Sequence, residues 1–359
     1  MLTRRPGLLT RLALSPRFHA LAERLPFLRS HARAEGRALF SILSGFVQSQ
    51  SLLALVELRL LHRLAEGPAD AATLAQTAQM PLARLGVLMQ AGAALRLVRH
   101  RAGLWHLAPR GAAFLAVPGL EAMVRHHPVL YRDLADPAAF FRGETVPELA
   151  GFWPYVFGEL AQTDANLAAR YSALMSDSQG LVAADTLRLV DLSDRKRLMD
   201  VGGGTGAFLR AVAARYPSLD LSLFDLPAVV AKADPAIPRL TVHPGSFRDT
   251  ALPNGADAIS LVRVLYDHPD TVVRHLMQSA HAALPPGGRL IVSEPMSGGD
   301  RPCPETDVYF AVYTMAMHTG RTRSAREISD IMQENGFAPR PMRRPMRPFV
   351  TSVVESVRA

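Results

Sequence analysis

A short apolar run that ends in a carboxylate and a cluster of glycines constrains the fold of this chain more than any other feature. Residues 197–206 read RLMDVGGGTG, and a helix-forming run begins at Ala207. The apolar part is typical of a buried parallel strand, so the pattern predicts a strand, a tight turn and a helix N-terminus. Gly202, Gly204 and Gly206 have no Cβ atom, so the backbone can adopt positive φ and a ligand can approach it closely. We expect a nucleotide-like ligand here.

A second carboxylate indicates which kind of nucleotide. The next strand, expected at 219–224, is followed by Asp225, and a carboxylate at the tip of the second strand binds ribose hydroxyls in doubly wound folds. NAD would also suit this arrangement. However, the first strand carries Asp200, and the turn lacks the second spacer of the G-x-G-x-x-G pattern that accommodates a pyrophosphate. An acidic turn favours a ligand with an amino group and a sulfonium cation over one with phosphates.

The string DVGGGTG at 200–206, followed by FDLP at 224–227, resembles the S-adenosylmethionine site of the large O-methyltransferase family that includes caffeate and acetylserotonin methyltransferases. The resemblance implies an α/β fold, with a seven-stranded, doubly wound, Rossmann-like methyltransferase domain preceded by an all-helical, winged-helix dimerisation domain. It also implies S-adenosylmethionine as the cofactor and S-adenosylhomocysteine as the product. The residues that it assigns to cofactor binding are Asp200, Gly202, Gly204, Gly206, Asp225, Leu226, Ser246, Phe247 and Arg263.

Length and composition agree with a globular enzyme of two domains. The chain has 359 residues, of which 48% are hydrophobic and 20% charged, and this excludes a disordered protein. The most apolar stretch, Phe46 to Leu64, contains Glu57, Arg59 and two further basic or histidine residues, so we expect no membrane span. The single cysteine, Cys303, excludes an internal disulfide, and no clustered metal ligands are apparent. A cytoplasmic, metal-independent protein is the simplest interpretation.

Four segments are expected along the chain, and the last contains alternating strands and helices that favour a parallel sheet covered on both faces. They are a basic N-terminal arm at 1–36, a winged-helix dimerisation domain at 37–118, a helical connector lining the substrate pocket at 119–190, and the S-adenosylmethionine-binding catalytic domain at 191–359. Strands of the last segment are expected at 197–201, 219–224, 240–243, 257–264 and 289–293, followed by an antiparallel pair at 339–344 and 348–357.

The winged-helix segment is open to two interpretations. Helices are expected at 38–64, 71–79 and 82–94, followed by two strands within 97–107. Such a module can bind DNA, and four basic or histidine residues lie near its wing. The third helix, however, offers only Arg84 and Gln90 for contacts with bases and phosphates. The resemblance implies a homodimerisation domain instead, with no nucleic-acid partner, while a ligand-binding regulator is the less favoured alternative.

The N-terminal arm carries most of the positive charge of the chain. The net charge is +8, and residues 1–40 contain eight arginines against Glu23 and Glu35. The arm is also rich in leucine, in partly helical spacing that Pro26 interrupts. A basic, leucine-rich segment suits either contact with a partner subunit or peripheral contact with an anionic inner or photosynthetic membrane. Both interpretations are open.

A tyrosine stands at the position of the family's general base. Family members have a histidine in an LHDW sequence, whereas residues 265–268 here read LYDH. Tyr266, with an ordinary pKa near 10, is a poor base at neutral pH but a good hydrogen-bond partner. Either His268 or a water molecule takes the substrate proton, or no strong base is used and the proton leaves after the C–O bond has formed. His268 as a plain surface residue of the turn before Pro269 is a further interpretation.

Two other positions depart from the family pattern, and one retains it. Ser246 stands where the family often has an aspartate near the adenine, and Thr322 stands where it has an acidic residue. Glu294, at the end of a predicted strand, matches the acid that orients the base in plant members. The candidate catalytic residues are therefore Tyr266, His268 and Glu294, in a retained site with altered acid–base chemistry.

The tyrosine, the LYDH run and residues 171–179 resemble the bacterial members of the family that act on photosynthetic pigments, above all the carotenoid 1-hydroxyl methyltransferases of purple bacteria. The resemblance implies methylation of a tertiary alcohol on a long polyene, a hydroxycarotenoid. A polyketide, an aromatic alcohol or a bacteriochlorophyll-type acceptor is the alternative. Aromatic and methionine side chains suit an apolar pocket, although they also simply fill cores. The candidate pocket residues are Trp153, Met175, Tyr309, Tyr313 and Met317.

Overall fold

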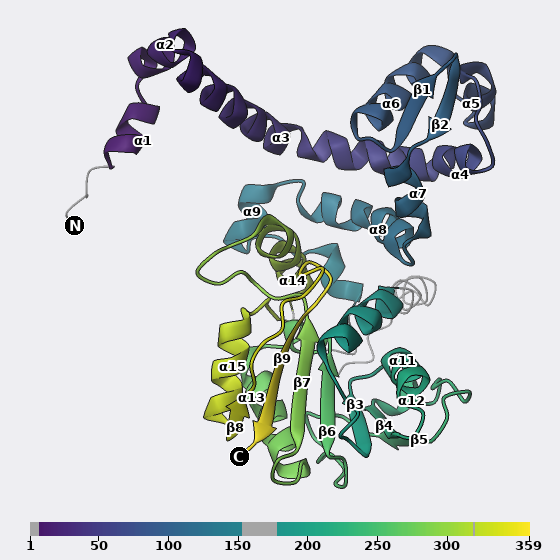
Figure 1. Ribbon diagram of the computed structural model, residues 1–359, viewed down its shortest axis with the longest axis vertical. Helices are drawn as coiled ribbons and strands as arrows, with labels where there is room; N and C mark the ends of the chain where they lie inside the picture. The colour runs from purple at the N-terminus through teal and green to yellow at the C-terminus, as the bar shows by residue number, and fades with distance from the viewer. Residues whose placement is uncertain (1–6, 153–177, 319) are drawn as a thin grey trace. The chain divides into compact units, whose positions relative to one another are not determined.

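The structure is a computed structural model that describes residues 7–152, 178–318 and 320–359. The chain divides into two compact units, Met1–Leu115 and Ala116–Ala359 (Figure 1). Each unit buries its own set of apolar side chains.

The first unit consists of helices that lead into a β-hairpin, as the sequence predicts. Asp70 caps a helix of this unit, because its side chain accepts a hydrogen bond from the N–H of Thr73. The hairpin reverses at Ala102 and Gly103, which both have positive φ, as a tight turn requires. The elements are α1 (Leu8–Ala13), α2 (Pro16–Arg24), α3 (Pro26–Glu57), α4 (Leu60–Ala65), α5 (Ala71–Thr77), α6 (Leu82–Ala94), β1 (Val98–Arg101), β2 (Leu104–Leu107) and α7 (Pro109–Ala116).

Helix α3 differs from the helix predicted at 38–64. It begins at Pro26, and a left-handed residue, Arg59 (φ 54°), separates it from α4. By length and apolar composition α3 is long enough to cross a membrane, a test that core helices of soluble proteins also pass. In the unit itself, large apolar side chains of α3 face outward, and the most exposed are Phe27, Leu39, Phe40, Ile42, Leu43 and Phe46. A broad apolar surface on one helix indicates that another surface covers it.

The second unit contains a seven-stranded sheet in the order β5-β4-β3-β6-β7-β9-β8. The first five strands in this order are parallel, and β9 runs antiparallel to β7 and to β8. The chain leaves β3 toward β4 and later returns to pair β6 on the other side of β3, so ligands are expected outside the carboxyl ends of these two strands. The strands are β3 (Arg197–Val201), β4 (Asp220–Asp225), β5 (Leu240–Pro244), β6 (Ala258–Val262), β7 (Arg289–Glu294), β8 (Phe337–Pro339) and β9 (Ser352–Arg358).

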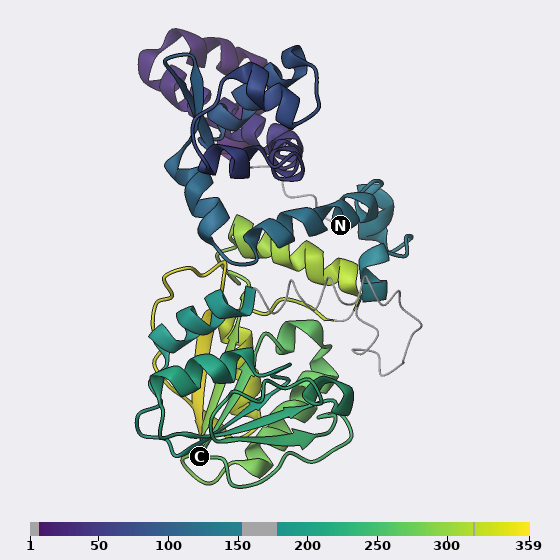
Figure 2. The same cartoon turned by 90° about the vertical axis from the view of Figure 1, so that its right-hand side faces the viewer.

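Helices cover both faces of this sheet, as Figures 1 and 2 show. Successive strand side chains point to opposite faces. Met199 packs with the helices α13 and α15, while its neighbour Leu198 packs with α11 and the helical residues 178–189. Fully buried parallel strands therefore carry apolar residues on both faces, which is why they read as continuous apolar runs in the sequence. The covering helices are α11 (Ala207–Arg215), α12 (Pro227–Val230), α13 (Asp270–Ala283) and α15 (Ala325–Glu334).

The C-terminal antiparallel pair was predicted with the wrong bounds, at 339–344 and 348–357. The observed strands are shorter and lie further apart in the sequence. Pro341, Pro345 and Pro348 stand between them, and proline has no N–H group to donate to a neighbouring strand.

A smaller helical cluster in the second unit packs against the end of α14. Its buried side chains include Phe140 and Leu149 from one stretch of chain and Met317 from another. The elements involved are α8 (Leu120–Asp133), α9 (Pro137–Arg142), the 3₁₀ turn η1 (Glu148–Phe152), the π-helical turn η4 (Pro304–Phe310) and α14 (Ala311–Met317).

Two adjacent phenylalanines in α9 provide a test of this packing. Phe140 is 4% exposed and belongs to the helical cluster, whereas Phe141 is 58% exposed. We expect Phe140→Ala to lower the free energy of unfolding by about 3–5 kcal/mol, because it leaves a cavity. The control Phe141→Ala should cost less than about 1 kcal/mol. Urea unfolding followed by circular dichroism measures both, and equal losses would contradict the observed packing.

Candidate active site at the carboxyl edge of the sheet

The glycine-rich turn after β3 has the backbone that the sequence predicts. Gly202, Gly204 and Gly206 have φ of 69°, 63° and 90°, a region that side chains other than glycine rarely adopt. Gly206 is the N-cap of α11. No described atom would lie within 4 Å of a Cβ atom at Gly204, so the turn is open on that side.

Asp225, at the end of β4, is bound to this turn. One carboxylate oxygen accepts a hydrogen bond from the N–H of Gly204 at 2.8 Å, and the other accepts from the N–H of Leu226 at 2.7 Å. Burial raises the pKa of Asp225, while these two hydrogen bonds oppose the rise. Each carboxylate oxygen can accept more than one hydrogen bond, so Asp225 retains acceptor capacity for ligand hydroxyls.

Asp200 lies under the turn and is fully buried. The Ser260 hydroxyl donates to its Oδ1 at 2.6 Å, and no described residue donates to its Oδ2. A Cβ atom at Gly203 would lie 2.4 Å from that oxygen, so only glycine fits there. Burial raises the pKa of Asp200 to about 7. Below the turn there is consequently a carboxyl group that nearby positive charge would ionise.

The loop after β5 brings two further predicted residues to this edge. The Ser246 hydroxyl accepts a hydrogen bond from the N–H of Arg248 at 3.2 Å, which shapes the loop locally. The Phe247 ring lies edge-on to the His268 ring, with 5.2 Å between ring centroids. A Cβ atom at Gly202 would lie 3.9 Å from the Phe247 ring. Phe247 therefore lies next to both His268 and the glycine-rich turn, and Ser246 precedes it in the same loop.

The turn after β6, at Arg263 to His268, carries the candidate catalytic tyrosine. Arg263 has a left-handed backbone (φ 59°), and its Nε donates to the Tyr266 hydroxyl at 3.2 Å. Its Nη1 donates to the Ser178 hydroxyl at 2.8 Å. Burial raises the pKa of Tyr266 far above its ordinary value. Tyr266 is therefore a neutral phenol at physiological pH, able to hydrogen-bond but unsuited to remove a proton.

Glu294, at the end of β7, holds the main chain of the same turn. Its Oε2 accepts hydrogen bonds from the N–H groups of Leu265 at 2.9 Å and Tyr266 at 3.3 Å. The side chain is fully buried, no described residue donates to Oε1, and burial raises its pKa to about 7. Glu294 thus acts on the position of Tyr266 through the backbone.

Arg323 donates hydrogen bonds to backbone carbonyl groups of the same turn. The sequence analysis did not single out this residue. Its side chain is fully buried and donates to the carbonyl oxygens of Leu265 at 2.8 Å and His268 at 2.9 Å. It also forms an ion pair with Asp270 at 2.6 Å. Arg323 lies in the polar run GRTRS at 320–324, where no local pattern distinguishes it from Arg321.

His268 is 8% exposed, so its interpretation as a surface residue of a turn is wrong. Its Nδ1 lies 3.3 Å from Nη2 of Arg248. A guanidinium group only donates, so Nδ1 is the acceptor and the ring proton is on Nε2. Burial, together with Arg248 and Arg323, lowers the pKa of His268 to about 4. It is consequently a neutral and weakly basic imidazole at physiological pH.

The predicted pocket residues Tyr309 and Tyr313 pair with histidines that the sequence did not single out. The Tyr309 hydroxyl lies 3.0 Å from Nε2 of His127, and the Tyr313 hydroxyl lies 3.0 Å from Nε2 of His126. The two tyrosine rings stack, with 6.2 Å between centroids. No sequence pattern links histidines in α8 to tyrosines so far along the chain. Met317 is fully buried in the helical cluster.

Two other predicted pocket residues, Trp153 and Met175, lie outside the described residues. Within the described ranges, no group of three or more histidine, cysteine or acidic side chains could hold a metal ion.

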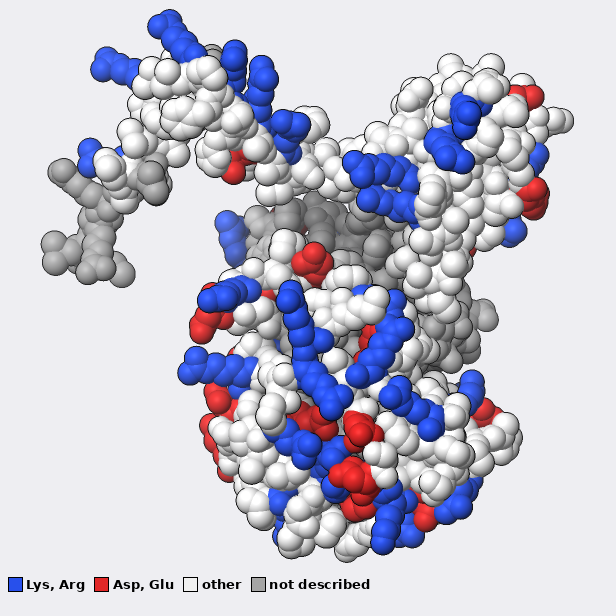
Figure 3. Space-filling model, viewed as in Figure 1, with Lys and Arg blue, Asp and Glu red and all other residues white. Residues whose placement is uncertain are grey.

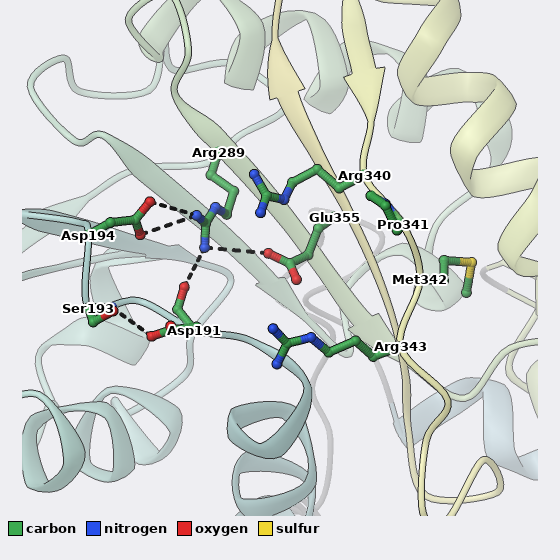
Figure 4. Close-up of a pocket in the computed structure, with 9 residues that line it drawn as sticks. All are labelled: Asp191, Ser193, Asp194, Arg289, Arg340, Pro341, Met342, Arg343 and Glu355. Atoms are coloured by element: carbon green, nitrogen blue, oxygen red, sulfur yellow. Dashed lines mark hydrogen bonds and ion pairs between the residues drawn. The ribbon is translucent and has the colours of Figure 1, made fainter.

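A hollow of about 460 Å³ lies at the other edge of the sheet (Figure 4). Arg289, the first residue of β7, forms ion pairs there with Asp194 at 3.0 Å and Glu355 at 3.6 Å. The glycine-rich turn and Tyr266 follow the carboxyl ends of their strands, so this hollow is separate from the candidate active site.

Comparison with known proteins identifies two family regions. Residues 131–338 match the O-methyltransferase domain, and residues 40–117 match the O-methyltransferase dimerisation domain. The chain is 63% identical to the demethylspheroidene O-methyltransferase of Rhodobacter capsulatus, over 99% of this chain and 90% of the relative. It is 59% identical to the protein of the same name from Cereibacter sphaeroides, over 97% and 94%.

Solved structures share the fold at much lower identity. The pyocyanin biosynthetic protein PhzM is 22% identical, with a TM-score of 0.77 over 91% of this chain and 99% of its own. The methyltransferase CalO1 of calicheamicin biosynthesis, in a form bound to S-adenosylhomocysteine, is 23% identical, with a TM-score of 0.75 over 91% and 98%.

The buried Glu294 gives a prediction for pH. Its pKa of about 7 in the folded chain exceeds the ordinary value of 4.5, so the folded state binds the extra proton and this contribution to stability falls as pH rises from 4.5 to 7. Glu294→Gln keeps an acceptor but cannot titrate. Relative to wild type, the variant should gain about 3 kcal/mol between about pH 5 and pH 8.

Urea unfolding of both proteins across this range measures the difference. The exposed Glu305 provides the control, and Glu305→Gln should follow the wild-type profile. A constant difference between wild type and Glu294→Gln across the range would refute the raised pKa.

Proposed function

The chain belongs to the O-methyltransferase family, and from this premise we propose that it methylates the tertiary 1-hydroxyl group of an acyclic carotenoid of the demethylspheroidene type. Its activity as an S-adenosylmethionine-dependent O-methyltransferase follows from the family itself. The substrate assignment rests on the full-length similarity to two demethylspheroidene O-methyltransferases. The product belongs to carotenoid biosynthesis.

The residues at the carboxyl edge of the sheet fit S-adenosylmethionine. We assign Asp225 to the ribose hydroxyls, because its oxygens are fixed by backbone N–H groups and keep further acceptor capacity. The open side of Gly204 allows the ligand to lie against the backbone. Asp200 places an ionisable carboxyl group under the turn, which favours a cationic ligand. When bound, S-adenosylmethionine supplies an electrophilic methyl group on sulfur.

Leu226, Ser246, Phe247 and Arg263 complete the proposed cofactor site. Phe247 offers an aromatic face close to the glycine-rich turn. Ser246 in place of the family's aspartate leaves a neutral group in that loop. Arg263 links this site to Tyr266 through its hydrogen bond to the phenol.

Tyr266 is proposed to orient the alcohol. Its oxygen accepts a hydrogen bond from Arg263 and has a second lone pair for the substrate hydroxyl. Neither Tyr266, whose pKa is raised, nor His268, whose pKa is about 4, is suited to deprotonate a tertiary alcohol. The proton therefore leaves as the C–O bond forms, when the oxygen becomes strongly acidic, and water can accept it. Glu294 and Arg323 position the turn that carries Tyr266.

An apolar pocket for the polyene is proposed along η4 and α14. The hydroxyls of Tyr309 and Tyr313 are occupied by His127 and His126, so their rings rather than free polar groups are available to a hydrocarbon chain. Trp153, Met175 and Met317 are the other proposed lining residues, and the buried Met317 supports this wall from within.

Mass spectrometry of pigments tests the proposed function directly. The purified protein is incubated with S-adenosylmethionine and a detergent-dispersed 1-hydroxycarotenoid, and a gain of one methyl group on the carotenoid is expected. Donor binding without methylation of this acceptor would overturn the substrate assignment, and a set of aromatic and polyketide alcohols would then be assayed in the same way.

Asp225→Asn should weaken S-adenosylmethionine binding at least tenfold, since the ribose loses a charged acceptor and each 1.4 kcal/mol changes affinity tenfold. Isothermal titration calorimetry measures the loss. Asp330→Asn, which changes an exposed carboxylate on α15 away from the glycine-rich turn, is the control and should bind normally. Unchanged affinity in Asp225→Asn would remove Asp225 from the site.

Tyr266→Phe should lower kcat about 10- to 100-fold, a smaller effect than loss of a general base, and leave donor affinity unchanged. His268→Gln, which keeps a neutral polar side chain, should lower kcat less than Tyr266→Phe does. Initial rates with saturating donor distinguish the two. Normal turnover in Tyr266→Phe would show that the phenol has no part in the reaction.

A homodimer is proposed, with a second copy of the chain on the exposed apolar surface of α3. The dimerisation-domain match begins at residue 40, within this surface. The double variant Phe40→Ser and Phe46→Ser should dissociate the dimer, because it places two hydroxyls in an apolar interface. The exposed Val87 is the control site, and Val87→Ser should stay dimeric. Light scattering coupled to size exclusion gives the masses, and a monomeric wild type would refute the proposal.

The family is one of soluble enzymes, and a peripheral position at the membrane is part of the proposal. Truncation of residues 1–34 tests the basic arm, and should weaken binding to anionic liposomes if the arm contacts lipid rather than the partner subunit. Equal binding by the truncated and full chains would remove the arm from membrane contact.

A further inference from the structure

A basic and apolar segment between β8 and β9 is not used by the proposed reaction. Residues 340–350 read RPMRRPMRPFV, with four arginines and no carboxylate. Met342, Met346 and Phe349 are 50%, 73% and 47% exposed. Large apolar side chains and arginines thus share one short stretch of surface, which we call the β8–β9 segment.

Three arginines of the β8–β9 segment form no close ion pair among the described residues, although Glu355 attracts Arg340 and Arg343 at longer range. Arg347 forms an ion pair with the buried Asp185 at 2.5 Å, which anchors the segment to the unit. Among the described residues, no carboxylate lies within ion-pair distance of Arg340, Arg343 or Arg344. Figure 4 shows Arg340 and Arg343 on either side of Glu355, which is itself paired with Arg289.

The β8–β9 segment extends from the hollow at one edge of the sheet to the active-site edge. Arg340 and Arg343 line the hollow. At the other end, the Thr351 hydroxyl is hydrogen-bonded to Ser293 at 2.7 Å, and Ser352 is paired with Glu294 in the sheet. Figure 3 shows basic side chains on the face of this unit where the yellow strand connection runs in Figure 1. The exposed Phe349 is thus two residues before Thr351, which lies at the active-site edge.

We propose that the β8–β9 segment docks the enzyme on the surface of an anionic lipid bilayer. Guanidinium groups bind phosphate with two parallel hydrogen bonds, and unpaired arginines beside an anionic leaflet are attracted to it. Methionine and phenylalanine tips enter the interfacial region, where apolar area is removed from water. A folded protein partner would offer carboxylates, but a lipid surface offers both the phosphates and the apolar layer that this segment matches.

The proposal rests on the proposed carotenoid substrate and deepens it. A polyene alcohol resides in the bilayer, so an enzyme whose docked segment leads at its C-terminal end to the active-site edge can receive it without transfer through water. The N-terminal arm is a separate basic element in the other unit, and the β8–β9 segment acts independently of it.

Vesicle co-sedimentation of the full chain tests the docking surface. The probes are vesicles of phosphatidylcholine alone and vesicles in which about one third of the lipid is phosphatidylglycerol, at low and high salt. Arg340→Gln, Arg343→Gln and Arg344→Gln combined should weaken binding to the anionic vesicles on the order of 100-fold, at about tenfold per 1.4 kcal/mol. The same three changes to lysine should retain most of the binding.

The matched control removes the same charge from the first unit. Arg84→Gln, Arg99→Gln and Arg101→Gln combined change three exposed arginines and should bind as wild type does. Equal losses in the two triple variants would show a general charge effect and overturn the proposal, as would unchanged binding in the first. If the glutamine variant does not fold, Met346→Ser with Phe349→Ser keeps every arginine and should also weaken binding, and wild-type binding there would overturn the apolar contribution.

Activity in two substrate forms separates this proposal from the proposed function. The triple glutamine variant should methylate the detergent-dispersed carotenoid at the wild-type rate and lose at least tenfold with carotenoid in anionic vesicles. Equal rates in both forms would overturn the docking role. Absence of methylation by the wild type in both forms would instead refute the carotenoid substrate, while vesicle binding would still report on the β8–β9 segment.

Discussion

The turn after β6 is held by two buried ionisable side chains, and the proposed site depends on them. Arg323 satisfies the carbonyl groups of Leu265 and His268, and Glu294 satisfies the N–H groups of Leu265 and Tyr266. Backbone groups beyond the end of a strand lose their sheet partners and, when buried, need others. Charged partners make stronger hydrogen bonds than neutral ones. The phenol of Tyr266 is consequently fixed by groups that need not touch the substrate.

This arrangement suits a reaction that depends more on alignment of the alcohol with the methyl donor than on acid–base catalysis. The phenol of Tyr266 and the imidazole of His268 are both shifted away from proton transfer at neutral pH, since the pKa of the phenol is raised and that of His268 is lowered. Alignment of an alcohol with an activated methyl group then supplies most of the rate. The loss of the family's histidine fits a tertiary alcohol, for which no side-chain base in this site would be strong enough.

How far the sequence predicts the site depends on the distance between the residues involved. The turn at Gly202–Gly206 and the carboxylate Asp225 follow from local patterns, because a strand, a turn and a helix read in order. The pairing of His126 and His127 with Tyr313 and Tyr309 has no local pattern, and neither does Arg323. The predicted bounds of the last two strands were wrong because Pro341, Pro345 and Pro348 lack an N–H group to donate, so most of the connection between β8 and β9 stays out of the sheet.

The sequence by itself determined the α/β fold, the succession of strands along the chain and the glycine-rich turn. Alternating apolar runs and positive-φ glycines are short-range constraints on the backbone. Tertiary structure alone decided the electrostatics of the candidate site. The pKa of Glu294 and that of His268 depend on how completely each is buried and on which charges come near. Arg323 and Arg248, which supply those charges, reach the turn from distant parts of the chain, and only the packed sheet brings them there.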